Sequence, residues 1–348
     1  MFRRHDQRMV FSKLFARHDE RLARKYGVTW GDPWHDPDLA AALPAVKAGD
    51  LAAGLALLDT PDPQLRSLRL HILSNETIPL LEKLESGMDQ PDPEPDLLMW
   101  AGATRTKAAW EIRTGAWAED VGEERFRRFH ETLAPAFEPL MYAAQISLTP
   151  TALDQLQWFG LGMGLSREEM DHLWERIVEL DPEHRASQES RFQVLCHKWS
   201  GSHEEMFDFA REAVARAPLG DRSLALIAKA HYENLNIMFR DEGLETYGAV
   251  RGVLEGYYSD PSVKAEIVDA VDRWLAGPLD YPLIARDAHM FGSTLHVAGE
   301  HQRAAAVLPL AGALVPDSGF ELWTFLDTHP PAYYARTRQK LGVPLPTV

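Results

Sequence analysis

Apolar residues recur at helical spacing along almost the whole chain. Hydrophobic side chains three and four positions apart predict amphipathic helices that each bury one stripe. No stretch shows the sustained apolar–polar alternation or the β-branched enrichment typical of strands, so we expect an all-α protein without a sheet. The predicted helices cover 2–26, 38–48, 50–59, 64–73, 76–86, 97–116, 122–147, 151–163, 166–180, 186–199, 202–216, 221–236, 243–257, 262–276, a pair within 285–316, 318–327 and 331–340.

Prolines divide this pattern. Pro135 and Pro139 fall inside the predicted helix 122–147 and are expected to kink or split it, because proline lacks a backbone N–H and clashes with the preceding turn. Residues 89–96 alternate prolines with acidic residues, which indicates an exposed loop or linker.

One helical hairpin is written twice in tandem. Ser166-Arg167-Glu168-Glu169-Met170 opens one helix, and Ser202-His203-Glu204-Glu205-Met206 opens another 36 residues later. Each opening has a serine followed three residues on by a glutamate, the pattern of a capping box. Each helix is preceded by a second one, and both units end at a proline. A period of this length is typical of helical solenoids.

The hairpin at 285–316 resembles the tetratricopeptide repeat. That family places small residues where its two helices cross, a glycine in the turn and a proline after the second helix. The unit at 187–218 resembles the repeat less closely, since Met206 stands where the family has a small residue. The resemblance covers about half of the chain and implies a right-handed solenoid of antiparallel helix pairs that binds peptides. The matching residues are Phe291, Gly292, Gly299, Ala304, Ala311 and Pro316, with Gly201, Ala210, Ala213 and Pro218 in the earlier unit.

The expected organisation has three parts. Residues 1–30 form a basic amphipathic N-terminal helix, 31–148 a helical region with the acidic loop at 89–96, and 149–348 the tetratricopeptide-like region with capping helices at its end. Within 2–26, eight basic residues stand against three acidic ones. This helix either docks on the acidic body of its own chain, which we favour, or binds a membrane surface or nucleic acid.

Charge and composition narrow the function classes. The formal net charge of −16 argues against a general nucleic-acid binder, because neutralising phosphates requires a basic face. No apolar run reaches the length of a membrane span, and no signal-peptide core is present, so we expect a cytoplasmic protein. The single cysteine, Cys196, lies in an apolar helical run, which favours a buried and unreactive thiol.

No arrangement of residues predicts catalysis. The glycines at 160, 162 and 164 end a predicted helix instead of following a strand, so a tight turn and a close helix crossing are expected there instead of a phosphate loop. His289, His296 and His301 lack a carboxylate at a fixed spacing, which makes zinc binding the less favoured interpretation. Cys196 and His197 are adjacent on a helix and point in different directions. We therefore expect no cofactor and no catalytic residue.

The favoured hypothesis is a non-enzymatic scaffold that holds a protein or peptide segment on a concave groove. A basic patch there suits a segment with an exposed carboxylate. One alternative is an enzyme or a small-ligand- or metal-binding protein with a Trp- and His-lined pocket near Trp30, Trp34 and His35. Another is an acidic regulator or immunity-type protein that binds a basic partner. The groove positions that the resemblance implies are Arg191, Lys198, Lys229, Tyr232, His289 and His296.

Overall fold

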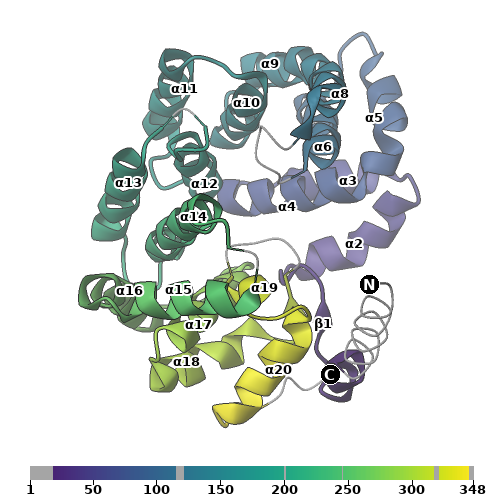
Figure 1. Ribbon diagram of the computed structural model, residues 1–348. Helices are drawn as coiled ribbons and strands as arrows, with labels where there is room; N and C mark the ends of the chain where they lie inside the picture. Colours follow the sequence, from purple (N-terminus) through teal and green to yellow (C-terminus); the bar gives the residue numbers. More distant parts are fainter. Residues whose placement is uncertain (1–18, 115–120, 200, 245, 317–320, 345–348) are drawn as a thin grey trace, which may run out of the picture. The chain divides into compact units, whose positions relative to one another are not determined.

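The computed structural model describes residues 19–114, 121–199, 201–244, 246–316 and 321–344. In these ranges nearly all of the regular secondary structure is helical, which confirms the all-α prediction (Figure 1). The expectation of no sheet is wrong in one detail. Strands β1 (Thr29–Trp30) and β2 (Leu314–Val315) pair in parallel. Two residues per strand are too few to produce an alternating pattern in the sequence.

The chain divides into two compact units. Unit 1 comprises Met1–His35 and Phe207–Val348, and unit 2 comprises Asp36–Met206. The boundary predicted at 148/149 falls inside unit 2, between two consecutive helices.

Unit 2 is built from helices joined by short turns. Proline and an acidic or hydroxyl residue mark several helix starts: Asp36 caps α2, Asp62 caps α4 and Thr149 caps α10, each followed directly by proline. The elements are α2 (Pro37–Lys47), α3 (Leu51–Leu58), α4 (Pro63–Glu76), η1 (Ile78–Leu80), α5 (Leu81–Met88), α6 (Pro95–Arg113), α8 (Glu123–Leu133), η2 (Ala134–Ala136), α9 (Phe137–Ile146), α10 (Pro150–Met163), α11 (Arg167–Leu180) and α12 (Arg185–Val194).

The predicted interruption near Pro135 is confirmed, because the 3-10 turn η2 separates α8 from α9. The glycines of α10 also behave as predicted. A Cβ on Gly162 would lie 2.5 Å from a methyl carbon of Leu133, and Gly164 ends α10 with a φ of 71°. The first glycine therefore allows a close helix crossing, and the second makes a left-handed turn that a side chain would strain.

The first part of unit 1 runs to His35 and is described from residue 19, and the unit resumes within α13 (His203–Arg216), where the chain leaves unit 2. Residues 1–18 of the predicted basic helix lie outside the described residues, but 19–25 are helical and contact α20 through the ion pair of Asp19 with Arg336 (2.7 Å). The other elements are η3 (Arg222–Ala225), α14 (Leu226–Asp241), α15 (Tyr247–Ser259), α16 (Pro261–Leu275), α17 (Ile284–Val297), α18 (His301–Val307), η4 (Leu308–Ala311), α19 (Trp323–Leu326) and α20 (Pro330–Lys340).

Helix α17 forms the centre of unit 1 and is buried along most of its length. Its Phe291 packs against Trp274 of α16, with ring centroids 5.2 Å apart. A Cβ on Gly292 would lie 2.4 Å from a methyl carbon of the buried Leu308, so only glycine permits this crossing of α17 with η4. The C-terminal helices α19 and α20 pack together, and Trp323 of α19 is fully buried.

Candidate functional site

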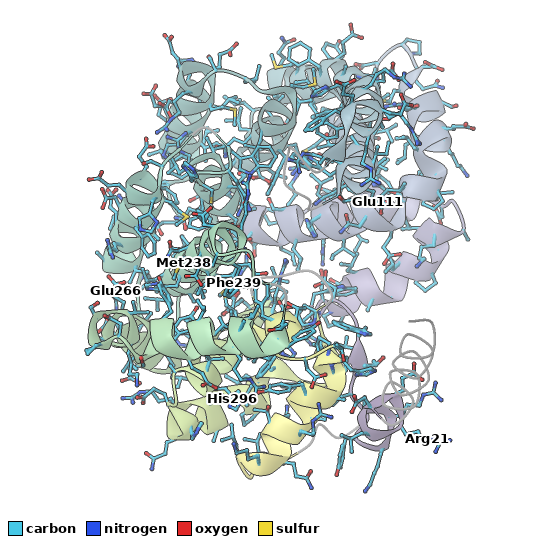
Figure 2. All side chains as sticks on the ribbon, in the orientation of Figure 1. Arg21, Glu111, Met238, Phe239, Glu266 and His296 are labelled. Carbon is cyan, nitrogen blue, oxygen red and sulfur yellow. The ribbon has the colours of Figure 1, made fainter. Side chains whose placement is uncertain are left out.

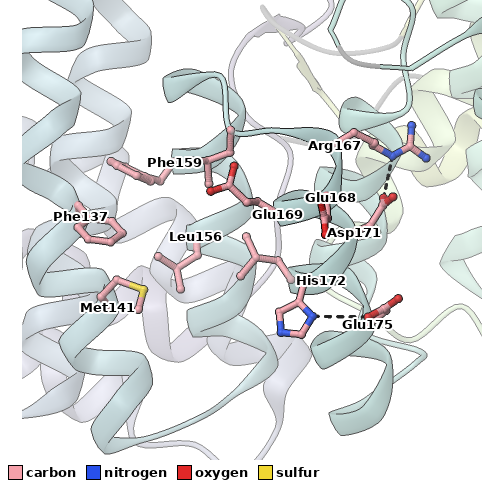
Figure 3. A pocket seen from close by; sticks show the side chains of 12 residues that line it. Phe137, Met141, Leu156, Phe159, Arg167, Glu168, Glu169, Asp171, His172 and Glu175 are labelled. Carbon is pink, nitrogen blue, oxygen red and sulfur yellow. Dashed lines mark hydrogen bonds and ion pairs between the residues drawn. The ribbon is translucent and has the colours of Figure 1, made fainter.

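A pocket of about 880 Å³ opens on unit 2 beside α9, α10 and α11 (Figure 3). Apolar side chains form its floor. The rings of Phe137 and Phe159 pack 5.5 Å apart, centroid to centroid, and Met141 stands one helical turn beyond Phe137 on α9. The remaining apolar lining comes from α10, from the turn after it and from α11: Leu156, Leu165 and Leu173. We call this site the α9–α11 pocket.

Local sequence signals position the three helices. The turn η2 stops α8 and lets α9 begin at Phe137. Helix α11 begins at the predicted capping box, and the structure confirms this box. The Ser166 hydroxyl accepts a hydrogen bond from the Glu169 backbone N–H at 3.2 Å, while the Glu169 carboxylate accepts one from the Ser166 backbone N–H at 2.8 Å. The side-chain and backbone hydrogen bonds from Ser166 lower the pKa of Glu169.

The α11 side of the pocket is acidic. Four carboxylates line it against one guanidinium, that of Arg167, and the imidazole of His172 has its Nδ1 3.6 Å from a Glu175 carboxylate oxygen (Figure 3). Burial alone would raise the pKa of Asp171, but hydrogen bonds from Arg167 and Arg191 outweigh it and lower that pKa. The four carboxylates are those of Glu168, Glu169, Asp171 and Glu175.

Several exposed apolar side chains lie on the helices that border this pocket. Within the described residues, six of the ten most exposed large hydrophobic side chains lie on α9, on α11 or on the turn after α9. Phe137, at the first position of α9, is 47% exposed. Among these side chains, that of Phe137 lines the α9–α11 pocket. The six residues are Phe137, Tyr142, Ile146, Leu148, Val178 and Leu180.

Arg191 and Lys198, the predicted groove residues of unit 2, occupy different environments. Arg191 lies on α12, is buried, and forms an ion pair with Asp171 at 2.5 Å. Its burial lowers the pKa of the guanidinium, and its Nε and Nη1 atoms have no hydrogen-bond partner among the residues that the structure describes. Lys198 is half-buried in the turn after α12, which ends at Val194 instead of reaching the predicted 199. The Arg191 charge is thus directed at α11 and not at an open surface.

Lys229 and Tyr232 both lie on α14 of unit 1. Lys229 is buried, with an exposed fraction of 5%. The Tyr232 ring packs against Phe325 of the segment α19, 5.4 Å between centroids, and burial raises the pKa of its hydroxyl.

His289 and His296 lie on α17 beneath the C-terminal helices. His289 is fully buried; its Nε2 hydrogen-bonds the Leu314 backbone oxygen at 2.7 Å, and its Nδ1 accepts the indole N–H of Trp323 at 3.2 Å. Burial lowers its pKa to about 3. The Nε2 of His296 (labelled in Figure 2) lies 3.2 Å from the Tyr333 hydroxyl. Burial lowers the pKa of His296 to about 4. Both imidazoles are therefore neutral at pH 7; His289 is fully buried and His296 is half-buried.

Two further polar clusters tie helices together. In unit 2, His184 is fully buried between two serines, with Nε2 3.0 Å from the Ser67 hydroxyl and Nδ1 2.6 Å from the Ser187 hydroxyl. In unit 1, the Nδ1 of His231 lies 2.7 Å from the Tyr257 hydroxyl, and its Nε2 lies 3.0 Å from a Glu266 carboxylate oxygen (Glu266 is labelled in Figure 2). The imidazoles of both clusters are at most 2% exposed, so a substrate has no direct access to either ring.

The other candidate residues, Cys196, Trp30 and His35, do not form a reactive site. Cys196 is buried, as predicted, with its sulfur 3.3 Å from the Phe192 backbone oxygen. Trp30 is 42% exposed in β1, and His35 lies at the surface. Among the residues that the structure describes, no three His, Cys, Asp or Glu side chains are grouped closely enough to hold a metal ion. No helix in the same ranges is long and apolar enough to cross a membrane.

Comparisons with protein-family models, with curated proteins and with solved structures found no significant match. The candidate site therefore depends on geometry alone. Sequence reasoning placed Phe137 and Met141 on a helix but did not identify their exposure. The sequence did contain a signal for this site. Pro135 interrupts the helix, a new apolar stripe begins at Phe137, and an acidic helix follows at 166–180.

Proposed function

We propose that this protein is a non-enzymatic binding protein that holds a peptide or protein segment in the α9–α11 pocket. The observation that carries the proposal is a pocket that combines an apolar floor, of which Phe137 is exposed to solvent, with charged side chains confined to one wall. Such a site offers hydrophobic contact area for a partner side chain and polar groups to orient it.

The proposed architecture is a right-handed tetratricopeptide-like solenoid of antiparallel helix pairs. Short turns support it: three residues separate α10 from α11, and three separate α17 from α18. Small residues at the crossings also support it, since Gly292, Ala304 and Ala311 are buried between α17 and the helices after it, as the resemblance implies. Scaffolds of this kind present surfaces for binding without supplying reactive groups.

A substitution at Phe137 tests the proposed function. Phe137→Asp places a carboxylate on the apolar floor, and the first position of a helix tolerates aspartate well. Tyr247→Asp is the matched control, because Tyr247 is also the first residue of its helix and is 48% exposed. A displayed library of helix-forming peptides about 16 residues long, roughly four turns, is selected on the full-length protein.

The selected peptides are then titrated against the wild type and both variants by fluorescence anisotropy. We expect Phe137→Asp to weaken binding at least about tenfold, since burying a carboxylate on an apolar surface without a partner is costly. Tyr247→Asp should leave the affinity within about twofold, as for surface changes outside an interface. Failure to select any peptide, or equal effects of the two substitutions, overturns the proposed function.

A further inference from the structure

The acidic wall of the α9–α11 pocket has a defined set of available charges. The Arg167 guanidinium is already engaged, because it contacts Asp171 at 2.7 Å and Glu205 at 2.8 Å. Asp171 is shared between Arg167 and Arg191. The carboxylate of Glu169 accepts the backbone N–H and the hydroxyl of Ser166. The paired charges of Arg167, Arg191, Asp171 and Glu205 contribute little net attraction to an incoming ligand, whereas Glu169, whose partners are neutral, adds to the negative charge of the wall.

Glu168 and Glu175 remain directed toward solvent at the pocket. Both are exposed, and among the described residues Glu175 has only the neighbouring His172 within ion-pair distance. They stand seven residues apart on α11, two helical turns, so their side chains share one face about 10 Å apart along the helix axis. The opposite side of the pocket, formed by Phe137 and Met141 of α9, supplies only apolar surface. The pocket is therefore apolar at its base and negative along one edge.

We propose that the occupant of this pocket is an amphipathic helix that carries lysine or arginine beside its apolar stripe, an inference that rests on the proposed function. The apolar stripe of such a helix packs on Phe137 and Met141, while its cations reach Glu168 and Glu175 from the rim. Side chains spaced three, four and seven residues apart on one helix match the seven-residue spacing of the two glutamates. Lysine and arginine suit this position because their stems pack on apolar surface while their charges stay in water.

The same charges disfavour other occupants. A peptide that ends in a carboxylate, which the basic groove positions led us to expect, meets like charge at Glu168 and Glu175. Like charges facing each other across an interface are repulsive and exclude partners. Of the expected cations of that groove, Arg191 and Lys229 are buried and Lys198 is half-buried. Charge complementarity at the open pocket thus selects a basic partner over an acidic one.

Three peptides test the inference. They share one apolar stripe, taken from the peptides selected above, and carry lysine, glutamine or glutamate at the flanking positions. We expect the lysine peptide to bind at least about tenfold more tightly than the glutamate peptide at low ionic strength, and added salt to reduce that ratio. Equal affinities for the three peptides, or a preference for glutamate, overturn the inference.

Variants of the wall locate the effect. Glu168→Lys with Glu175→Lys should reverse the order of the lysine and glutamate peptides, and Glu168→Gln with Glu175→Gln should reduce the preference without reversing it. The control is Glu82→Lys with Glu111→Lys, two exposed positions of α5 and α6 in the same unit, which change the net charge equally. If the control weakens binding of the lysine peptide as strongly as the wall variants do, Glu168 and Glu175 are not the residues that attract the cations, and the inference is overturned.

The two proposals fail in different ways. If Phe137→Asp abolishes binding of all three peptides but the peptides bind equally to the wild type, the pocket is a binding site and only the basic partner is wrong. If no peptide binds, the proposed function fails as well. A third outcome is that the wild type self-associates and binds no peptide, and that Phe137→Asp makes it monomeric. In that case the occupant of the pocket is a second copy of this chain, and the inference is overturned.

Discussion

Replacing Asp154 by asparagine should make unit 2 more stable at alkaline pH. Asp154 lies on α10 and is 3% exposed. One carboxyl oxygen accepts the Ser190 hydroxyl at 2.6 Å, and the other lies 3.0 Å from the Gln155 side-chain nitrogen. Burial raises the pKa of Asp154 to about 7, against the opposing effects of the Ser190 hydrogen bond and the charge of Lys107.

The sign follows from the two pKa values. In the unfolded chain the Asp154 carboxyl has its ordinary pKa of 3.8, and in the folded protein it keeps its proton up to about pH 7. The unfolded state therefore binds fewer protons between these values, and the free energy of unfolding falls as the pH rises from about 4 to about 7. Three pKa units correspond to roughly 4 kcal/mol, an upper figure for a single buried group. Asparagine imitates the protonated acid, since it offers one acceptor to Ser190 and one donor to the Gln155 amide after that amide turns over.

The assay is guanidinium unfolding at pH 5, 7 and 9, with hydrogen exchange of α10 and α12 as the readout specific to unit 2. We expect Asp154→Asn to raise the free energy of unfolding at pH 9 by roughly 2–4 kcal/mol and to have a much smaller effect at pH 5. Asp92→Asn, in the exposed loop before α6, is the control and should change neither value. A variant that is less stable than the wild type at pH 9 refutes the reasoning, because it would mean that Asp154 is ionised and held by Lys107.

Two substitutions and one change of pH test the packing of unit 1. Gly292→Ala should destabilise the protein by about 1–3 kcal/mol, because the new Cβ meets Leu308. Gly252→Ala should stabilise α15 by up to about 1 kcal/mol, because no described atom lies within 4 Å of the new Cβ. Thermal unfolding of both variants measures these effects, and equal shifts would contradict the close crossing at Gly292. Acidification should destabilise unit 1 as the pH falls from 6.5 toward 3, by up to roughly 5 kcal/mol from His289 alone, because its protonated ring sets an N–H against that of Trp323. Hydrogen exchange of α17 measures this, and protection that stays constant from pH 7 to pH 4 argues against it.

Helix positions were predictable because the signals are local. Asp36-Pro37, Thr149-Pro150 and Asp260-Pro261 each combine a capping side chain with a proline at the first helical position, and each starts a helix in the structure. The capping box at Ser166 formed for the same reason. These interactions involve residues within one turn of each other, so they depend little on the rest of the fold.

The predicted groove depended on distant neighbours and could not be located in the same way. A polar residue on the first helix of a repeat was interpreted as facing an open concave surface. In the structure, α19 and α20 lie against α17, so His289 is buried against Trp323, and His296 is half-buried beside Tyr333. Arg191 meets the acidic helix α11. Charge reversal at Arg191 is therefore a poor test of binding. A glutamate at this position would face Asp171, and the repulsion between the two carboxylates would destabilise the fold.

Helix α12 shows why polarity alone misleads in an all-helical protein. Its sequence is rich in serine, glutamine and arginine, yet Ser187, Ser190 and Gln193 are buried. Ser190 donates to Asp154 and accepts from Gln157, both on the neighbouring α10, so its burial leaves no hydrogen-bonding group of the hydroxyl unsatisfied. Periodicity reports which residues share a face but not what covers that face. The apolar stripe of α9 shows the opposite error. Its spacing predicted burial, yet Phe137 is open to solvent. A basic amphipathic helix could cover this stripe, because the stripe lies beside the acidic helix α11.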